Sequence, residues 1–294
     1  MIRRFAFAAI AASVLFLAAC GGQQAPQMSD AQRKAQEGTQ RLSASEGGKI
    51  VLRAIEAHGG LEAWYSAPTS SFTWEYSNAG MNGRFKTRAV VDNNTRQAYH
   101  QILAIGTPDE PKPYEGSFAW DGEKAWIYPA DTPIIAPRFW ALTGYYFQQI
   151  PFVLADPGLS YEVLPDAELD GKPYDMVRAS FGSGIGDSPG DTYTLYVDKE
   201  TDMVAGIRYT VTYGRQPRAA GDEPPGETLM LYQDYTTVDG LTVPKHFYGS
   251  NFANGEVVNF KNEAWADEIS YTQPFDATQL EMPEGAKIQP PPGQ

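Results

Sequence analysis

The order of hydrophobic and polar residues divides the chain into a helical beginning and a long series of predicted strands. Apolar residues repeat at helical spacing over residues 50–57, and two glycines at 59–60 end this predicted helix. Residues 61–65 predict a second, short helix that ends before Pro68, because the residue before a proline disfavours helical backbone. From Ser70 the period changes to two, which is typical of half-buried strands.

Turn signals separate the strands that follow. Asp-Gly pairs stand at 121–122 and 239–240, and an Asn-Gly pair stands at 254–255. These residues tolerate the positive φ angles that tight turns need. The clearest predicted strands are residues 72–76, 84–91, 96–103, 174–181, 204–213 and 257–269. We expect about ten or eleven antiparallel strands in one domain, and a sheet of that size curls.

A segment in the middle of the chain breaks the strand pattern. Residues 137–152 begin with a proline and carry apolar or aromatic side chains on nearly every side, which predicts a helix bounded by Pro151. Such a helix inside a curled sheet either plugs the interior or lines a cavity for an apolar ligand, and both interpretations stay open. The candidate ligand-lining residues are Phe139, Trp140, Tyr145, Tyr146, Phe147 and Phe152 of this segment and Trp74, Trp120 and Trp126 of the strands. Arg138 either caps the helix or holds a lipid headgroup.

These patterns together predict a single α+β domain. Its curved antiparallel sheet forms an incomplete β-barrel, with an N-terminal helix and a central aromatic helix that covers or plugs it. The folded domain is expected over residues 47–280, and residues 281–294, which are rich in proline, are expected to form a loose tail.

The first residues carry the most specific signal in the sequence. Arg3 and Arg4 precede an apolar run over residues 5–19, which is short for a bilayer-spanning helix of about 20 residues and typical of a signal peptide. The run ends in Leu-Ala-Ala followed by Cys20, the only cysteine, which is the pattern of a lipobox. We therefore expect a lipoprotein signal peptide over residues 1–19 and lipidation of Cys20.

Lipidation would place the protein in the cell envelope. Several acyl chains anchor a protein stably, because each buried methylene contributes about 0.8 kcal/mol. Gly21 follows the cysteine, whereas an aspartate there retains lipoproteins in the inner membrane of many Gram-negative bacteria. We expect an outer-membrane anchor with the domain facing the periplasm. Residues 20–46 are polar and predict a flexible tether, partly helical around residues 31–37.

Composition and charge exclude several classes of function. The chain has 36 acidic against 23 basic residues and a net charge of −13, so it lacks the basic surface that phosphate groups require, and we expect no nucleic-acid partner. Aromatic residues make up 13% of the chain, which argues against a disordered protein. A single cysteine excludes an intramolecular disulfide and a cysteine-clustered zinc site.

Candidate catalytic groups are few and scattered. His58, His100 and His246 lie far apart in the sequence and lack the spacing of metal ligands. We interpret His58 as a cap of the first helix, where a cationic ring would meet exposed carbonyls, and His246 as a residue on a strand surface. The glycines of residues 182–190 are interpreted as a hairpin loop. We therefore expect no catalytic residue, no metal and no cofactor.

Two strings of residues resemble the strand–turn–strand units of the outer-membrane lipoprotein-localisation superfamily, the LolA/LolB-like proteins. The first is LYVDKET at residues 195–201, and the second runs from YQDY through VDGLTVPKHF over residues 232–247. The segment around Trp140 and the AHGG at residues 57–60 resemble an uncharacterised bacterial lipoprotein branch with this fold. The resemblance covers about residues 47–280, and its motifs encode turns.

This resemblance implies an incomplete barrel with an apolar cavity, because members of that superfamily shelter the acyl chains of lipoproteins, lipids or glycolipids. A lipidated chain fits a membrane-fixed role better than a shuttle, and no functional residue of the family is carried over. The expected partners are a lipid or other apolar small molecule and other lipoproteins. Two alternatives stay open. One is an interaction lipoprotein with a filled barrel that uses the loops 182–190 or 215–226, and the other is a periplasmic hydrolase built around His100 or His246.

Overall fold

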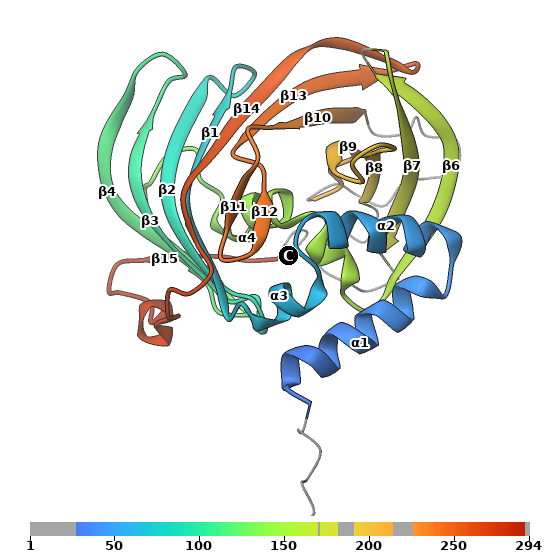
Figure 1. The fold of residues 1–294 in the computed structure, drawn as a ribbon. Helices are drawn as coiled ribbons and strands as arrows, with labels where there is room; N and C mark the ends of the chain where they lie inside the picture. Colours follow the sequence, from blue (N-terminus) through green and yellow to red (C-terminus); the bar gives the residue numbers. More distant parts are fainter. Residues whose placement is uncertain (1–27, 170, 182–190, 214–225, 292–294) are drawn as a thin grey trace, which may run out of the picture.

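The computed structural model describes residues 28–169, 171–181, 191–213 and 226–291 (Figure 1). Four α-helices are present in these ranges: α1 (Asp30–Ser43), α2 (Glu46–Ala57), α3 (Leu61–Ser66) and α4 (Pro137–Gln149). Two short 3-10 helices are η1 (Phe152–Ala155) and η2 (Ala277–Leu280). No helix within the described ranges is long and apolar enough to cross a membrane.

Thirteen strands form one antiparallel sheet, in the order β15-β5-β4-β3-β2-β1-β14-β13-β10-β9-β8-β7-β6. The first part of the chain contributes β1 (Thr69–Asn78), β2 (Gly83–Asp92), β3 (Ala98–Gly106), β4 (Pro111–Trp120) and β5 (Ala125–Tyr128). The second part contributes β6 (Leu159–Leu169), β7 (Lys172–Phe181), β8 (Thr192–Asp198), β9 (Val204–Tyr209), β10 (Glu227–Gln233), β13 (His246–Ala253), β14 (Glu256–Ser270) and β15 (Lys287–Gln289). A separate hairpin consists of β11 (Thr236–Val238) and β12 (Leu241–Val243).

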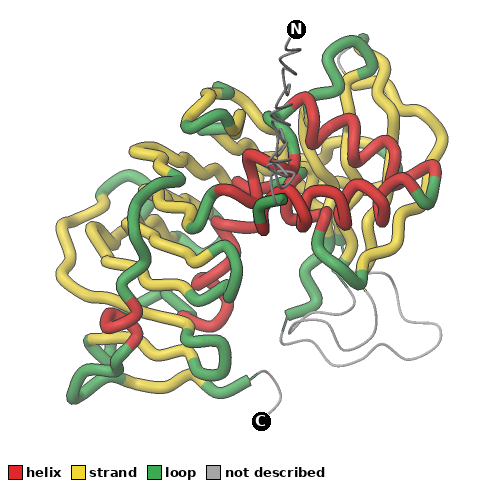
Figure 2. Tube along the Cα trace, turned by 60° about the horizontal axis from the view of Figure 1, so that its bottom comes forward, coloured by secondary structure: helices red, strands yellow, loops and turns green. Residues whose placement is uncertain are grey.

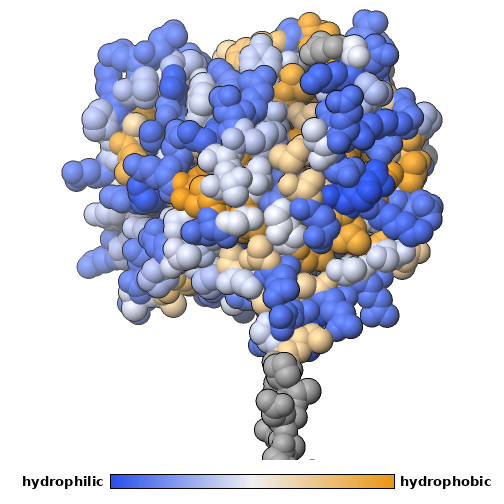
Figure 3. Space-filling model, in the orientation of Figure 1, coloured by the Kyte–Doolittle hydropathy of each residue, from blue (hydrophilic) through white to orange (hydrophobic). Residues whose placement is uncertain are grey.

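The sheet curves without closing, since the edge strands β15 and β6 are not paired with each other in the described part of the chain. Its two halves join where β1 pairs with β14, with Trp74 opposite Ala266 and Tyr76 opposite Ala264. The α-helices lie close to one another with strands on either side of them (Figure 2). On the face drawn in Figure 3 hydrophilic residues dominate, and hydrophobic residues occur in scattered groups.

Helix α4 lies inside the curve of the sheet (Figure 1), and its residues pack on side chains of β1 and β2. Trp140 contacts the rings of Tyr76 and Phe85, with centroids 4.6 and 4.8 Å away. A Cβ on Gly144 would lie 2.7 Å from the ring of Trp74, so only a glycine allows this approach of helix and strand. The predicted central helix is confirmed, and its inner face fills part of the barrel.

The number of strands is larger than the ten or eleven predicted. The sequence revealed only the end of β4, because Pro111 and Pro113 hide the alternation over its first half, which is largely exposed. The strands β11, β12 and β15 have three residues each, which is too short for a period of two to stand out.

Two segments contain more regular structure than predicted, namely the tether, for which only a partial helix around residues 31–37 was expected, and the C-terminal tail. Helix α1 lies within the predicted tether of residues 20–46, and the capping box of Ser29 and Gln32 begins it. Its buried side chain is Leu42, which is 1% exposed. Few other apolar residues in this segment could indicate that the helix packs against the domain. Within the predicted tail of residues 281–294, β15 pairs with β5. Residues 1–19 and Cys20 lie outside the described residues.

Candidate functional site

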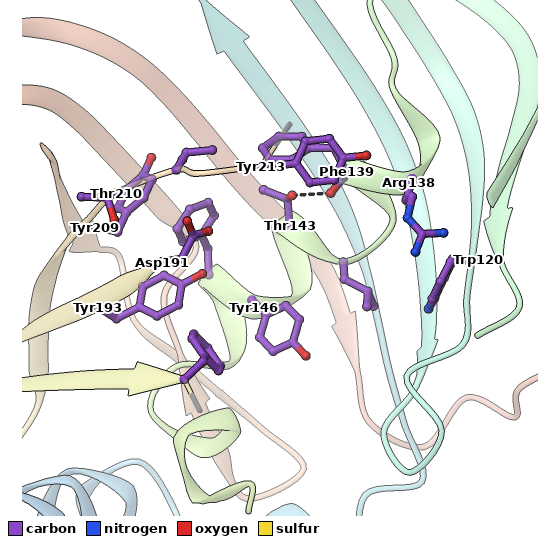
Figure 4. Close-up of a pocket in the computed structure, with 14 residues that line it drawn as sticks. Trp120, Arg138, Phe139, Thr143, Tyr146, Asp191, Tyr193, Tyr209, Thr210 and Tyr213 are labelled. Carbon is purple, nitrogen blue, oxygen red and sulfur yellow. Dashed lines mark hydrogen bonds between the residues drawn. The ribbon is translucent and has the colours of Figure 1, made fainter. Parts of the chain in front are cut away.

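A pocket of about 290 Å³ lies between α4 and the strands β7, β8 and β9 (Figure 4). Eight of its fourteen lining residues are aromatic. The lining consists of Trp120, Arg138, Phe139, Leu142, Thr143, Tyr146, Phe147, Phe181, Asp191, Tyr193, Tyr209, Thr210, Val211 and Tyr213. A concave, mostly apolar site with a few polar groups is the ordinary form of a small-molecule site.

The helical wall of the pocket is one stripe of α4. Phe139, Leu142, Thr143, Tyr146 and Phe147 all line it, and they repeat at the spacing of a single helix face. The opposite face of the helix packs on the sheet through Trp140 and Gly144, as described above. One face of α4 therefore packs against the sheet, and the other lines the pocket.

The strand wall is built from rings that touch one another and α4. Tyr193 of β8 stands opposite Tyr209 of β9 in the register of the two strands, and their centroids are 6.4 Å apart. Phe147 of the helix meets Tyr209 at 4.9 Å, and Phe181 of β7 meets Tyr193 at 5.8 Å. Phe139 meets Tyr213 at 5.2 Å. These contacts fix the rings as a rigid wall.

Polar groups stand on both sides of α4 (Figure 4). On one side the guanidinium of Arg138 lies 4.6 Å from the centroid of the Trp120 ring, which is a cation–π contact. On the other side the carboxylate of Asp191 accepts hydrogen bonds from the backbone N–H and the hydroxyl of Thr212, at 2.6 and 2.7 Å. Burial raises the pKa of Tyr193, so its hydroxyl stays protonated and remains a hydrogen-bond donor.

The nine predicted lining residues divide between pocket and core. Trp120, Phe139, Tyr146 and Phe147 line the pocket. The other five are buried, namely Trp74, Trp126, Trp140, Tyr145 and Phe152. Phe152 stacks on Trp64 with centroids 5.2 Å apart, and Trp126 donates its indole N–H to the carbonyl of Leu280 at 2.9 Å. These five side chains are packed within the protein and do not line the pocket.

Sequence reasoning missed the strand side of the pocket. Phe181, Tyr193 and Tyr209 occur in strands with ordinary alternation, and no local signal separates them from core residues. The helix side had a signal, because residues 139, 142, 143, 146 and 147 form one stripe. Arg138, interpreted as a cap or a headgroup ligand, lines the pocket and also donates its backbone N–H to the side chain of Gln289 at 3.0 Å.

A partly buried ion pair holds the segment after α4 against the sheet. Arg96 has a positive φ of 60° between β2 and β3, and its guanidinium binds both carboxylate oxygens of Asp156, at 2.8 and 3.0 Å. The same group donates to the hydroxyl of Tyr145 at 2.5 Å. Their side chains are 18% exposed for Arg96 and 30% for Asp156. This cluster ties the segment after α4 to the sheet.

The three histidines lie in separate environments. The ring of His58 is fully buried and bonded to backbone groups, and burial lowers its pKa to about 4. The predicted cationic cap is therefore wrong, although His58 does follow the last residue of α2. His100 is buried beside α4, while His246 pairs with Glu263 at 2.6 Å beside Trp265. Within the described ranges, no group of three or more metal-binding side chains comes together.

A second pocket, of about 440 Å³, lies on the opposite face of the sheet. Tyr196 lines it, whereas its neighbours Leu195 and Val197 belong to the main core, as strand alternation requires. Leu164 and Phe252 also line it, and the guanidinium of Arg208 lies 4.9 Å from the ring centroid of Phe252. No pattern in the sequence indicated this outer pocket.

Comparison with known proteins identifies the fold. No protein-family model matches the sequence, and no curated protein matches it. A LolA superfamily protein from Nitrosomonas europaea has a similar structure, with a TM-score of 0.50, 8% identity, and coverage of 80% of this chain and 97% of that one. A DUF1329 family protein from Desulfovibrio piger gives a TM-score of 0.49 and 12% identity, covering 82% of this chain and 97% of that one. The chain has a LolA/LolB-like fold, which confirms the resemblance seen in its turn motifs.

Proposed function

We propose that this protein is a lipid-anchored envelope protein that binds an apolar molecule in the pocket between α4 and strands β7 to β9, without catalysis. The observation that carries the proposal is the helical stripe of α4, whose apolar and aromatic side chains line a space of about 290 Å³. Apolar surface left around an open pocket is available to a ligand.

The sequence supports the anchor and its location. The lipobox ends at Cys20, and α1 begins at Asp30. Ten residues span at most about 35 Å when fully extended, so a lipidated Cys20 would hold the domain close to the membrane surface. The glycine after Cys20 favours the outer membrane. By resemblance to the LolA/LolB-like proteins, the ligand is a lipid or another apolar molecule of the envelope.

The chemistry of the lining favours binding over bond breaking. Among the fourteen lining residues, the only carboxylate is that of Asp191, which already accepts two hydrogen bonds from Thr212, and none of them is a histidine. General acid–base catalysis needs a titratable group poised to exchange a proton near neutral pH. The aromatic walls supply apolar contact area instead.

The proposal is tested with the mature protein released from its membrane by a mild, non-lipidic detergent. Apolar molecules are extracted from it with organic solvent and identified by mass spectrometry, and binding of a fluorescent fatty acid and a fluorescent aromatic probe is titrated. We expect a retained apolar molecule or saturable binding of at least one probe. Leu142→Trp would fill the pocket and weaken binding at least tenfold.

The matched control makes the same substitution in the outer pocket. Leu164→Trp adds an equal volume there and leaves binding unchanged. Circular dichroism establishes that both variants are folded. A protein that carries no apolar molecule and binds neither probe contradicts the proposal, and so does binding that Leu142→Trp leaves intact.

A further inference from the structure

We infer that the pocket beside α4 selects a flat, ring-containing apolar molecule with a hydrogen-bonding substituent in preference to a flexible acyl chain. The inference rests on the proposed function, since it names the class of ligand for the same pocket. Four properties of the lining carry it: the kind of side chains, their arrangement, the size of the space and the position of its hydroxyl groups.

The lining contains more aromatic side chains than the binding of a flexible acyl chain requires. Eight of its fourteen residues carry aromatic rings, whereas Leu142 and Val211 are its only aliphatic side chains. An acyl chain gains from any apolar surface in proportion to the area buried. A flat ring gains more beside aromatic side chains, because stacked and edge-to-face pairs contribute about 0.5–1.5 kcal/mol beyond that area.

The rings are arranged as fixed partners for a flat ligand. Tyr193 and Tyr209 stand side by side on neighbouring strands, tilted by only 32° from each other. Phe147 braces Tyr209 from the helix, with an angle of 57° between their planes. A wall of rings that already contact one another loses little conformational freedom when a ligand arrives, and this preorganisation favours a rigid guest.

The size of the pocket also favours a compact molecule. An apolar cavity of about 150 Å³ is known to hold one benzene ring. The space beside α4, at about 290 Å³, is roughly twice as large and matches a molecule of two fused rings. The several acyl chains of a bilayer lipid or of a lipoprotein anchor exceed this space.

Hydroxyl groups give the pocket a polar contact for a ring substituent. Tyr193 and Thr210 both line it, and Figure 4 shows Tyr193, Tyr209 and Asp191 grouped on one side of α4. The phenolic hydroxyl of Tyr193 is a hydrogen-bond donor to a carbonyl or hydroxyl oxygen of a ligand. A purely hydrocarbon chain would leave these hydroxyls without a partner from the ligand, which costs binding free energy.

The test compares four probes by isothermal titration calorimetry on the mature protein from which bound material has been extracted. Naphthol is flat and carries a hydroxyl, naphthalene lacks the hydroxyl, saturated decalin alcohol has the hydroxyl but no flat ring, and decanoic acid is a flexible chain. We expect naphthol to bind at least tenfold more tightly than decalin alcohol and decanoic acid, and several-fold more tightly than naphthalene.

Two variants locate the preference in this pocket. Tyr193→Phe keeps the ring and removes the hydroxyl, so naphthol and naphthalene should bind it equally. Phe147→Leu removes a ring but keeps an apolar side chain, so it should weaken naphthol at least fivefold and leave decanoic acid within twofold. Leu164→Trp, in the outer pocket, should change neither the affinity for naphthol nor that for decanoic acid. A loss of naphthol binding in that variant would contradict the assignment of binding to the pocket beside α4.

The outcomes separate this inference from the proposed function. If decanoic acid binds as tightly as naphthol or more tightly, the preference for rings is wrong while the proposed apolar site stands. If decalin alcohol equals naphthol, flatness does not matter and the inference fails again. If no probe binds and no apolar molecule is extracted from the protein, both are wrong.

Discussion

His58 and His100 are buried, neutral side chains that connect neighbouring elements through hydrogen bonds. Nδ1 of His58 donates to the carbonyl of Thr242 at 2.7 Å, and its Nε2 accepts from the backbone N–H of Val204 at 3.2 Å. Nε2 of His100 donates to the carbonyl of Ala141 at 2.9 Å, while its Nδ1 accepts from the hydroxyl of Thr87 at 3.2 Å. Each ring is thereby held in one tautomer, and a second proton would break one of its bonds.

We expect stability to fall steeply in mild acid. Burial lowers the pKa of His58 and of His100 to about 4, below the unfolded value of 6.5. The unfolded state therefore binds protons first as the pH falls, so stability is complete above pH 6.5 and declines between pH 6.5 and 4. Each histidine accounts for a loss of about 3 kcal/mol over this range. Urea denaturation at several pH values measures it.

The control for this pH dependence is His100→Gln, whose amide can donate to Ala141 without titrating. It should lower stability at neutral pH but flatten the decline in acid. A variant with the same slope as the natural protein would show that His100 is not responsible.

At Gly144, helix propensity favours alanine, whereas close packing against the sheet favours glycine. Alanine would favour the helix by about 1 kcal/mol. Its Cβ, however, would stand 2.7 Å from the ring of Trp74, which is held between β1 and α4. Overpacking of this kind costs about 1–3 kcal/mol, so we expect Gly144→Ala to destabilise the protein by up to about 2 kcal/mol net. Thr143→Ala, on the pocket side of the same turn, should change the free energy of unfolding by less than about 0.5 kcal/mol. A stabilising Gly144→Ala would mean that α4 can move away from the sheet.

At the scale of the elements, α4 and the strands differ in how far the sequence could predict them. The helix could be predicted from the sequence, because Pro137 begins it, Pro151 follows it and aromatic residues occur on nearly every side of it. Tyr193 and Tyr209 meet only because β8 pairs with β9 in a particular register. Alternation along each strand could not predict that they face the pocket-lining stripe of α4, because the position of a helix within a curved sheet depends on long-range packing.

The ion pair of Arg96 and Asp156 should matter more than a surface ion pair of the same type. Removing one partner of a buried pair leaves an uncompensated charge, and because Asp156 is partly exposed we expect Arg96→Gln to cost about 2–4 kcal/mol. Arg53 binds Asp175 and Asp202 but is 46% exposed, so Arg53→Gln should cost less than about 1 kcal/mol. Equal losses in chemical denaturation would contradict the structural role assigned to Arg96.

At the scale of the whole molecule, the short strand β15 protects one edge of the open sheet. Its three residues pair with β5, and Gln289 also binds the backbone of Arg138 at the start of α4. Removal of residues 283–294 should lower the free energy of unfolding by about 1–2 kcal/mol and promote association through the exposed edge of β5. Light scattering and thermal denaturation measure both effects. Removal of residues 292–294 alone should have neither effect, and a full effect from this short deletion would contradict the role of β15.

The pairing of β1 with β14 joins segments that are nearly 200 residues apart, since Trp74 stands opposite Ala266. A chain that emerges from its N-terminus cannot form this seam until almost all of it has emerged. Until then, one edge of β1 is unpaired and its apolar side chains are exposed. Contacts between residues so far apart in the sequence form slowly. Folding of this protein should therefore be completed only after nearly the whole chain has emerged, and the half-made sheet is the state that chaperones would need to protect.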